Sequence, residues 1–317
     1  MARISKAQKK KLGLILINSS AGTVKSLGVE KVRDIVDAAI SEHRLPFKLK
    51  IVEGEEIDAA VTQAIKDGAF AIAVGGGDGT ASSIAQRLAG TSIPLAVLPL
   101  GTMNLFARAA GMPDTLEEAL KSLEHTQVFD IDLGSVNGRT FLRQISFGLQ
   151  PKIVRMREKL GYRSRLTKML SGLRALIGAM ADPSRLRILA SVDGTPRAFK
   201  CPALVVTNNL YGKGHVPFQD RLDEGVLGLY VVKTVALIPA LSIVKDMASG
   251  NWQDSPYVDT DRAKVIEIRK FSSRFQRRSM ATISVDGELE TYDLPIKIEI
   301  RPKVLKLLKP ATATKPM

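Results

Sequence analysis

Apolar and polar residues alternate with two different periods along the first third of the chain. Short apolar runs, which are typical of buried strands, lead into segments whose apolar residues recur at helical spacing. The predicted strands cover residues 12–18, 47–52, 69–74 and 95–98, and the predicted helices cover 29–42, 57–67 and 81–88. Strands and helices that alternate in this way predict an α/β fold, in which helices cover both faces of a parallel sheet.

The pattern changes after residue 129, where short strand-like segments predominate. Three turns contain an Asx-Gly pair, Asn137-Gly138, Asp193-Gly194 and Asp286-Gly287, which is a preferred sequence for a two-residue hairpin. The predicted strands are 130–136, 139–146, 185–192, 203–208, 228–233, 263–270, 281–285 and 297–301. One helical pattern, over 166–180, interrupts them. These features predict an antiparallel, β-rich second domain.

We therefore expect two domains, 1–129 and 130–309, with the last strand returning toward the first domain, and a disordered tail at 310–317. A chain of 317 residues is long enough to bury two cores. No apolar run approaches the roughly 20 residues that cross a bilayer, and the basic N-terminus lacks the apolar segment of a signal peptide. The single cysteine, Cys201, excludes a disulfide framework and a cysteine-based zinc site. These features predict a cytoplasmic protein.

The composition adds a strong positive charge, since 46 Lys and Arg against 32 Asp and Glu give a net charge of +14. The excess is concentrated in residues 1–11, 152–174 and 262–278. Clustered charge of this kind indicates a surface that faces phosphate, anionic lipid or nucleic acid, although a solvated face explains any single cluster equally well. Aromatic residues make up only 5% of the chain and form no stacking platform, so we expect no specific nucleic-acid binding.

The sequence Gly75-Gly76-Gly77-Asp78-Gly79-Thr80 joins a buried strand to a helix that we expect to begin at about Thr80. Glycines let the backbone approach a polyanion closely, and the free N–H groups at the start of a helix favour phosphate. Thr80 is suited to cap the helix or contact phosphate, and Asp78 to hold magnesium or receive a proton. The loop is neither a P-loop nor a Gly-x-Gly-x-x-Gly fingerprint. By itself it predicts a polyanion-binding site.

Together with three further motifs, this loop resembles the diacylglycerol kinase catalytic-domain family, which includes sphingosine kinases, ceramide kinases and soluble bacterial lipid kinases. The further motifs are Asn18-Ser-Ser-Ala-Gly22, Leu98-Pro-Leu-Gly-Thr-Met-Asn-Leu-Phe-Ala-Arg108 and Val285-Asp-Gly-Glu288, in that order. The resemblance covers about residues 11–309. It implies an α/β N-terminal domain similar to those of phosphofructokinases and NAD kinases, and an antiparallel β-sandwich as C-terminal domain.

The resemblance also implies that ATP binds in a cleft between these domains. The implied nucleotide-binding residues are Asn18, Ser20, Gly22, Gly75, Gly76, Gly77, Asp78, Gly79, Thr80, Gly101, Thr102 and Asn104. The implied catalytic residues are Asp78 together with Asp286 and Glu288, of which one carboxylate accepts the proton of the attacking hydroxyl. We prefer Glu288 as this base, because Asp286 also fits the turn of a hairpin.

A second acidic site is implied by the bacterial members of the family, in which an Asp-Asp-Gly turn resembles a structural magnesium site. The corresponding turn reads Asp223-Glu224-Gly225 in this chain. Its ligands would be the Glu224 carboxylate and the main-chain carbonyls of Arg221 and Val226. An ordinary solvated turn is the alternative.

Ser19 replaces the proline of the family pattern, and three further departures remove expected polar contacts. Ala21 replaces a serine, Leu105 replaces an acidic residue, and Glu53 stands near a usual Thr or Ser, so we expect weakened ATP affinity or a different nucleotide. The basic amphipathic pattern at 160–180 suits either a membrane interface or packing on the second domain.

Taken together, the residues and the resemblance predict an ATP- and Mg²⁺-dependent kinase that phosphorylates a diacylglycerol-like or sphingoid lipid. Its partner would be an anionic membrane surface, to which the cytoplasmic protein binds peripherally. The alternatives are a kinase of a small polar substrate, similar to an NAD kinase, and a catalytically weak, lipid-binding regulatory homologue. The oligomeric state stays open, a homodimer included.

Overall fold

The computed structural model describes residues 11–160, 186–212, 219–234, 249–272 and 279–311, together with six residues between 236 and 246. For residues 156–160 it describes the backbone only. The helix predicted over 166–180 lies outside the described residues. Of the predicted tail, Pro310 and Ala311 are described, and Pro310 ends a strand.

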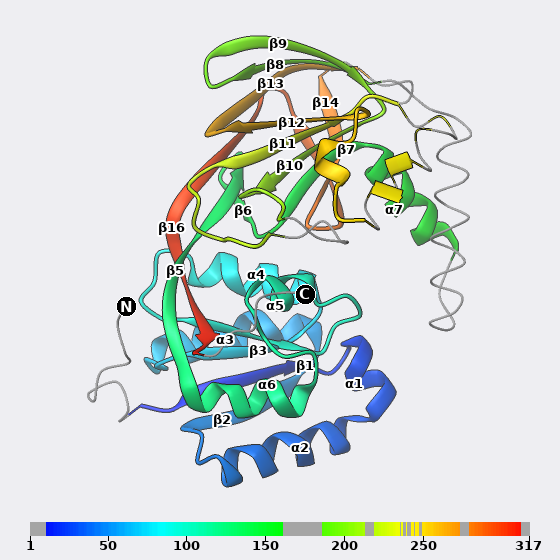
Figure 1. The fold of residues 1–317 in the computed structure, drawn as a ribbon. Helices are drawn as coiled ribbons and strands as arrows, with labels where there is room; N and C mark the ends of the chain where they lie inside the picture. The colour runs from blue at the N-terminus through cyan, green and yellow to red at the C-terminus, as the bar shows by residue number, and fades with distance from the viewer. Residues whose placement is uncertain are drawn as a thin grey trace. The chain divides into compact units, whose positions relative to one another are not determined.

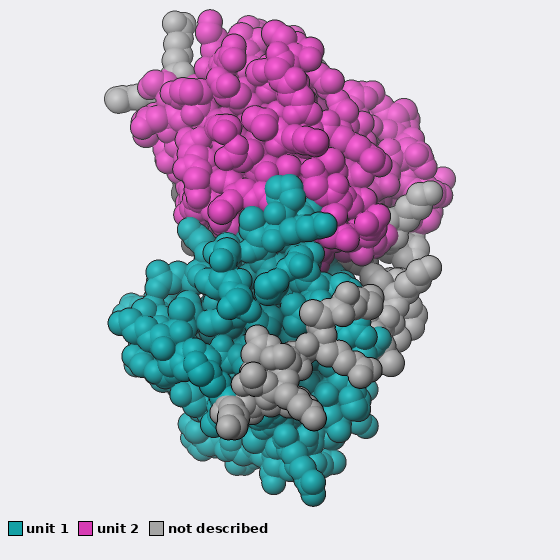
Figure 2. Space-filling model, turned by 90° about the vertical axis from the view of Figure 1, so that its left-hand side faces the viewer, with its two compact units in different colours: residues 1–133, 302–317 teal, residues 134–301 magenta. Residues whose placement is uncertain are grey.

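The chain divides into two compact units, which Figure 2 shows in different colours. The first unit comprises residues 1–133 and 302–317, and the second comprises residues 134–301. The chain passes from one unit to the other within two strands, β5 (Thr126–Val136) and β16 (Ile296–Pro310). Segments from both ends of the sequence therefore build the first unit.

The first unit contains a parallel sheet in the order β2-β1-β3-β4-β16. Its strands are β1 (Gly13–Asn18), β2 (Phe47–Val52), β3 (Ile72–Gly76) and β4 (Leu95–Pro99), and the end of β16 pairs with β4. Nearly every residue of the central strands β1, β3 and β4 is buried, which explains why their sequences are continuously apolar. The predicted parallel sheet is confirmed.

Helices cover both faces of this sheet (Figure 1). One group consists of α1 (Gly22–Leu27), α2 (Val29–Glu42) and α6 (Leu116–Ser122), and the other of α3 (Ile57–Lys66), α4 (Asp78–Leu88) and α5 (Leu105–Ala109). Each longer helix buries one stripe; in α2 the buried residues are Val32, Val36 and Ala39, which recur at helical spacing. The fold of the first unit is thus the helix-covered α/β arrangement that the sequence predicts.

The second unit contains two antiparallel sheets that share one core. The first sheet has the order β12-β11-β10-β7-β14-β15, and the second contains β16-β13-β8-β9. The strands are β7 (Gln144–Gly148), β8 (Leu186–Val192), β9 (Thr195–Cys201), β10 (Ala203–Asn208), β11 (Leu227–Val232), β12 (Val258–Ala263), β13 (Val265–Ser272), β14 (Met280–Val285) and β15 (Glu288–Asp293). Phe147 and Ile283 from one sheet meet Ile188 and Ile268 from the other in the core. The predicted antiparallel β-sandwich is confirmed.

Two of the differences from the predicted element boundaries bear on the candidate site. Helix α4 begins at Asp78 rather than near Thr80, with the extended Gly77 as its N-cap. The strand predicted over 139–146 is interrupted, because it forms two strands, β6 (Arg139–Phe141) and β7. Between them, the main-chain N–H groups of Leu142 and Arg143 bind a side chain instead of a neighbouring strand.

Candidate active site

Three loops of the first unit meet at one edge of the parallel sheet. Strands β1, β3 and β4 run in the same direction and end at Asn18, Gly76 and Pro99. The loops that follow these strands therefore leave the sheet side by side. They carry the nucleotide-binding residues that the sequence predicts in this unit.

The first loop is tied to the second by Asn18. Its amide Nδ2 donates a hydrogen bond to Thr80 Oγ1 at 3.2 Å, and its Oδ1 accepts one from the main-chain N–H of Ser20 at 2.9 Å. Gly22 begins α1 beside the third loop, where a Cβ on it would lie 3.1 Å from Thr102 Oγ1. The loop that carries Asn18, Ser20 and Gly22 thus lies beside the glycine loop and the third loop, and its contact with a nucleotide stays a prediction.

The glycine loop has no room for a side chain at Gly75 or Gly76. A Cβ on Gly76 would lie 2.7 Å from the Cβ of Thr80, which folds back over the loop. Asp78 stands in the first turn of α4 and its Oδ1 accepts the main-chain N–H of Phe106 at 3.1 Å. The first turn of an 11-residue helix therefore lies within the loop, with the helix dipole favouring an anion at this end.

The third loop packs directly against the glycine loop. Asn104 adopts a left-handed backbone (φ 50°), and its Oδ1 accepts the main-chain N–H of Gly101 at 2.7 Å. A Cβ on Gly101 would lie 2.8 Å from that oxygen and 2.9 Å from the Cα of Gly77. Gly101 is needed because the two backbones approach each other this closely, whereas a Cβ on Gly77 would meet no atom of the described residues within 4 Å.

Thr23 and Gly54 also belong to this cluster, although the motifs did not single them out. The N–H of Thr23 donates to the Leu100 carbonyl at 3.2 Å, which links the first loop to the third. A Cβ on Gly54 would lie 3.9 Å from Asn18 Nδ2, so the loop after β2 borders the same cluster. Thr23 directly follows the Asn18–Gly22 motif, and Gly54 lies just after the predicted strand 47–52. These positions are the only sequence features that point to either residue.

The three departures from the family pattern have local structural explanations. Ala21 and Leu105 are 6% and 7% exposed, so both side chains contribute to the core of the first unit rather than to a polar surface. The Glu53 and Glu56 side chains and main-chain N–H groups form a capping box around the short helix η2 (Gly54–Glu56). The Glu53 side chain therefore caps this short helix.

In the second unit, the predicted Asp286-Gly287 hairpin turn is present. It joins β14 to β15, and both residues have positive φ angles, 48° and 100°. The Asp286 carboxylate accepts main-chain N–H groups from Leu142 at 2.8 Å, Arg143 at 2.8 Å and Gln144 at 3.0 Å. The aspartate thus fastens the β14–β15 turn to the loop between β6 and β7.

Glu288 follows this turn and has a different environment. Its side chain is 67% exposed, and its Oε2 lies 3.9 Å from a guanidinium nitrogen of Arg139. The same guanidinium pairs with Glu290 at 2.5 Å, and the Tyr292 hydroxyl donates to Glu290 at 2.6 Å. Burial and the adjacent Glu290 carboxylate raise the pKa of Tyr292, so this phenol stays protonated. Glu288 is accordingly the exposed member of a small charged cluster.

The residues of the implied structural metal site hold a turn together. Glu224 Oε2 accepts the Leu210 N–H at 3.1 Å, and the Val226 carbonyl accepts the Asn209 N–H at 3.0 Å. The Arg221 guanidinium pairs with Asp223 at 3.2 Å, which places a cation on the same turn. No group of three or more His, Cys, Asp or Glu suited to a metal occurs among the described residues. These contacts hold the turn together through protein groups alone, and the magnesium site stays a prediction beside the ordinary turn.

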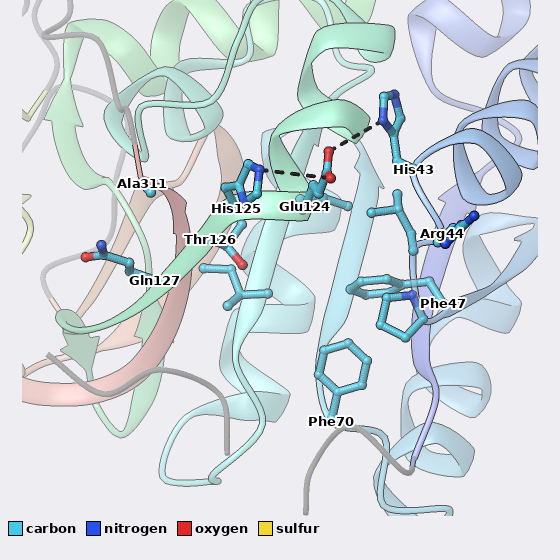
Figure 3. Close-up of a pocket in the computed structure, with 13 residues that line it drawn as sticks. His43, Arg44, Phe47, Phe70, Glu124, His125, Thr126, Gln127 and Ala311 are labelled. Carbon is cyan, nitrogen blue, oxygen red and sulfur yellow. Dashed lines mark ion pairs between the residues drawn. The ribbon is translucent and has the colours of Figure 1, made fainter. Parts of the chain in front are cut away.

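A separate cavity of about 710 Å³ lies in the first unit, near the amino ends of β2 and β5 (Figure 3). Phe47 and Phe70 line it with their ring centroids 5.0 Å apart, and Glu124 lies between His43 and His125. None of the predicted site residues lines this cavity. Its position at the amino end of β2 separates it from the three loops described above, which follow the carboxyl ends of the strands.

Among the residues that the structure describes, no helix is long and apolar enough to cross a membrane.

Two family models match the sequence and together cover most of it. The model for the diacylglycerol kinase catalytic domain matches residues 13–136. The model for the YegS C-terminal NAD kinase beta sandwich-like domain matches residues 144–309. The glycine loop and the loops around it fall within the first match, and the Asp286-Gly287 hairpin falls within the second.

Similar proteins and structures span the same length. A probable lipid kinase YegS-like from Pseudomonas aeruginosa (strain UCBPP-PA14) is 30% identical over 290 residues, which cover 84% of this chain and 91% of that protein. One from Pseudomonas savastanoi pv. phaseolicola is 35% identical, covering 88% and 89%. The crystal structure of a putative diacylglycerol kinase from Bacillus anthracis str. Sterne has a TM-score of 0.73 at 20% identity, covering 96% of this chain and 97% of that one. At that identity the structural likeness establishes the fold.

Proposed function

Because the chain belongs to the diacylglycerol kinase catalytic-domain family, with a YegS-type C-terminal domain, we propose that it transfers the γ-phosphate of ATP to a hydroxyl group of a lipid. The observation that carries the proposal is the convergence of three loops around the Asn18–Thr80 hydrogen bond. A kinase needs such a preorganised cradle because phosphoryl transfer depends on positioning and on stabilising charge.

The first unit supplies the phosphate-binding half of this reaction. The close approach of Gly77 and Gly101 leaves backbone rather than side chains facing the phosphates, and the first turn of α4 offers free N–H groups. Magnesium accompanies ATP in phosphoryl transfer and neutralises charge on the phosphates. Asp78 would hold this ion, since it is the carboxylate of the glycine loop and carboxylate oxygen is a preferred magnesium ligand.

The second unit supplies the base, and we assign that role to Glu288 rather than Asp286. The oxygens of Asp286 accept three main-chain N–H groups, which commits this carboxylate to the turn. Glu288 is exposed and its contact with Arg139 is long. As the lipid oxygen bonds to the γ-phosphorus, the bond to the ADP oxygen breaks and the hydroxyl proton passes to Glu288.

Two observations support a lipid as the substrate: the family to which the chain belongs, and the lack of a residue pair that NAD kinases use for their substrate. An NAD kinase uses an Asn-Glu pair for its substrate, whereas Asn104 is followed by the buried Leu105. The proposed substrate is a diacylglycerol-like or sphingoid lipid, which the protein would reach as a peripheral protein at the membrane surface.

The test is turnover of radiolabelled ATP by purified protein in mixed detergent micelles. Diacylglycerol, monoacylglycerol, sphingosine, ceramide and phosphatidylglycerol are offered beside NAD, with and without Mg²⁺. We expect a labelled lipid product that requires Mg²⁺. Phosphorylation of NAD and of no lipid would contradict the proposal.

A further inference from the structure

Strands β13, β8 and β9 form an exposed face of the second unit, which lies at the top of Figure 1. Their inward residues belong to the sandwich core. Their outward residues form rows across the strands: Ser272, Arg187 and Lys200 lie side by side in one row, Lys270, Leu189 and Ala198 in the next, and Glu267, Ser191 and Pro196 in a third. The six side chains of the first two rows are exposed. We call these six residues the basic face.

The basic face carries three cations and no carboxylate. Arg187 and Lys200 are direct cross-strand partners, and Lys270 lies in the next row. Within the part of the chain that the structure describes, none of the three has an ion-pair partner. Among the cations close to the face, Arg197 pairs with Asp261, Arg269 with Glu267 and Lys297 with Glu299, whereas Arg262 and Lys264 have no ion pair with any described residue. The basic face is therefore distinguished by three cations on two adjacent rows that contain no carboxylate.

This arrangement calls for an external anion. Like charges directly opposite each other on neighbouring strands destabilise a sheet. Because strands lie about 4.8 Å apart and alternate residues about 7 Å apart, the backbone positions of the three cations fall within roughly 12 Å of one another. Anions placed above the two rows would offset this repulsion, and no carboxylate of the face does so.

The shape of the face and its apolar residue identify the kind of partner. Leu189 is 46% exposed, and its cross-strand neighbours are Lys270 and Ala198. A small ligand requires a concave pocket, whereas two rows of side chains on a sheet present a broad surface. Several anions spread over a surface, with an apolar layer beneath them, are the chemistry of a bilayer that contains anionic lipids.

We propose that the basic face docks this protein on an anionic lipid bilayer, with Arg187, Lys200 and Lys270 over the headgroups and Leu189 reaching the apolar boundary. The inference deepens the proposed function, since a lipid kinase must reach a membrane-held substrate, but docking itself needs neither ATP nor turnover. Each cation near an anionic surface contributes roughly a fivefold factor to binding, so three contribute on the order of 100-fold. Salt screens this attraction.

The test is co-sedimentation of the full chain with phosphatidylcholine vesicles that contain or lack phosphatidylglycerol, at low and high salt and without ATP. The face variant is Arg187→Gln/Lys200→Gln/Lys270→Gln. The matched control, Lys31→Gln/Lys66→Gln/Lys121→Gln, removes the same net charge from exposed helix positions of the first unit. Turnover of detergent-dispersed lipid by each protein is measured alongside.

We expect the face variant to lose on the order of 100-fold in affinity for phosphatidylglycerol vesicles, while the control stays within a few fold of wild type. Both should turn over detergent-dispersed lipid normally. Equal losses in the two variants, no vesicle binding by wild type, or a face that binds duplex DNA or RNA but not vesicles would overturn the docking proposal. Normal vesicle results without any lipid turnover would instead overturn the proposed function and leave docking intact.

Discussion

Two hairpin turns of the second unit share the sequence Val-Asp-Gly and the same backbone conformation. At Asp193-Gly194 the φ angles are 47° and 85°, and at Asp286-Gly287 they are 48° and 100°. In both turns the aspartate accepts main-chain N–H groups from a distant segment. Asp193 binds those of Lys264 and Val265, and Asp286 binds those of Leu142, Arg143 and Gln144.

The turns differ in the residue that follows. Thr195 follows the first, whereas Glu288 follows the second and lies next to Arg139. In both turns the aspartate carboxylate therefore has a structural role. The second turn differs from the first because a glutamate follows it. This comparison supports our assignment of the proton-accepting role to Glu288 and of a purely structural role to Asp286.

The largest expected effect is on turnover in Glu288→Gln. Loss of a general base lowers the rate by roughly 10²–10⁴-fold, while an exposed side chain changes the free energy of unfolding by less than about 0.5 kcal/mol. Lipid phosphorylation and thermal melting measure the two effects. Glu267→Gln is the matched control, because Glu267 is also a strand glutamate paired with an arginine and should keep full turnover.

Asp286→Ala should produce the largest loss of stability in the series. Three partly buried N–H groups lose their acceptor, which we expect to lower the free energy of unfolding by about 3 kcal/mol. Denaturant unfolding followed by circular dichroism measures it. A free energy of unfolding equal to that of wild type would show that the turn does not depend on this carboxylate.

Asp193→Ala should cost less, about 1 kcal/mol, because its two hydrogen bonds are exposed and water replaces the lost acceptor. Asn137→Ala, at the third Asx-Gly turn, loses a single exposed bond from Lys297 and should cost less still. Each of the three substituted residues has a left-handed backbone, so the three alanine variants carry the same backbone cost. Differences among their free energies of unfolding therefore report the lost side-chain hydrogen bonds. The same unfolding series measures them, and a reversed order would contradict the comparison.

The smallest effect is expected when a glutamate is placed after the first turn. Thr195→Glu changes an exposed residue and should leave both stability and turnover near wild type. Added to Glu288→Gln, it should not restore lipid phosphorylation in the same assay. Rescue by Thr195→Glu would mean that any carboxylate after an Asp-Gly turn suffices.

Strands β1, β3 and β4 were predictable because burial on both faces makes their sequences continuously apolar. Residues 203–208 form a strand with the predicted bounds, and so do 47–52, an edge strand in which apolar and polar residues alternate. Residues 29–42 form the predicted helix. The edge strands β9, β12 and β15 were not predicted. Their sequences, such as Glu-Leu-Glu-Thr-Tyr-Asp in β15, are largely polar, and they become strands by pairing with β8, β11 and β14.

The candidate site likewise contains some features that the sequence predicts and others that it does not. Parallel strands end at one sheet edge, so the meeting of the three loops of the first unit followed from the order of the motifs. The Asp286 hydrogen bonds join residues 142 to 144 positions apart, and no local pattern encodes them. The pairing of Arg139 with Glu290 likewise depends on which strands lie together. The sequence thus indicated two candidate carboxylates for the base, Asp286 and Glu288, and their contacts in the structure distinguish the two.

The most direct test compares Glu288→Gln with Asp286→Asn in parallel, each by thermal melting and by turnover well below its melting temperature. We predict that Glu288→Gln melts like wild type and loses at least about 100-fold in turnover, whereas Asp286→Asn melts lower and keeps turnover within about tenfold. The reverse result, a stable and inactive Asp286→Asn beside an active Glu288→Gln, would contradict the assignment.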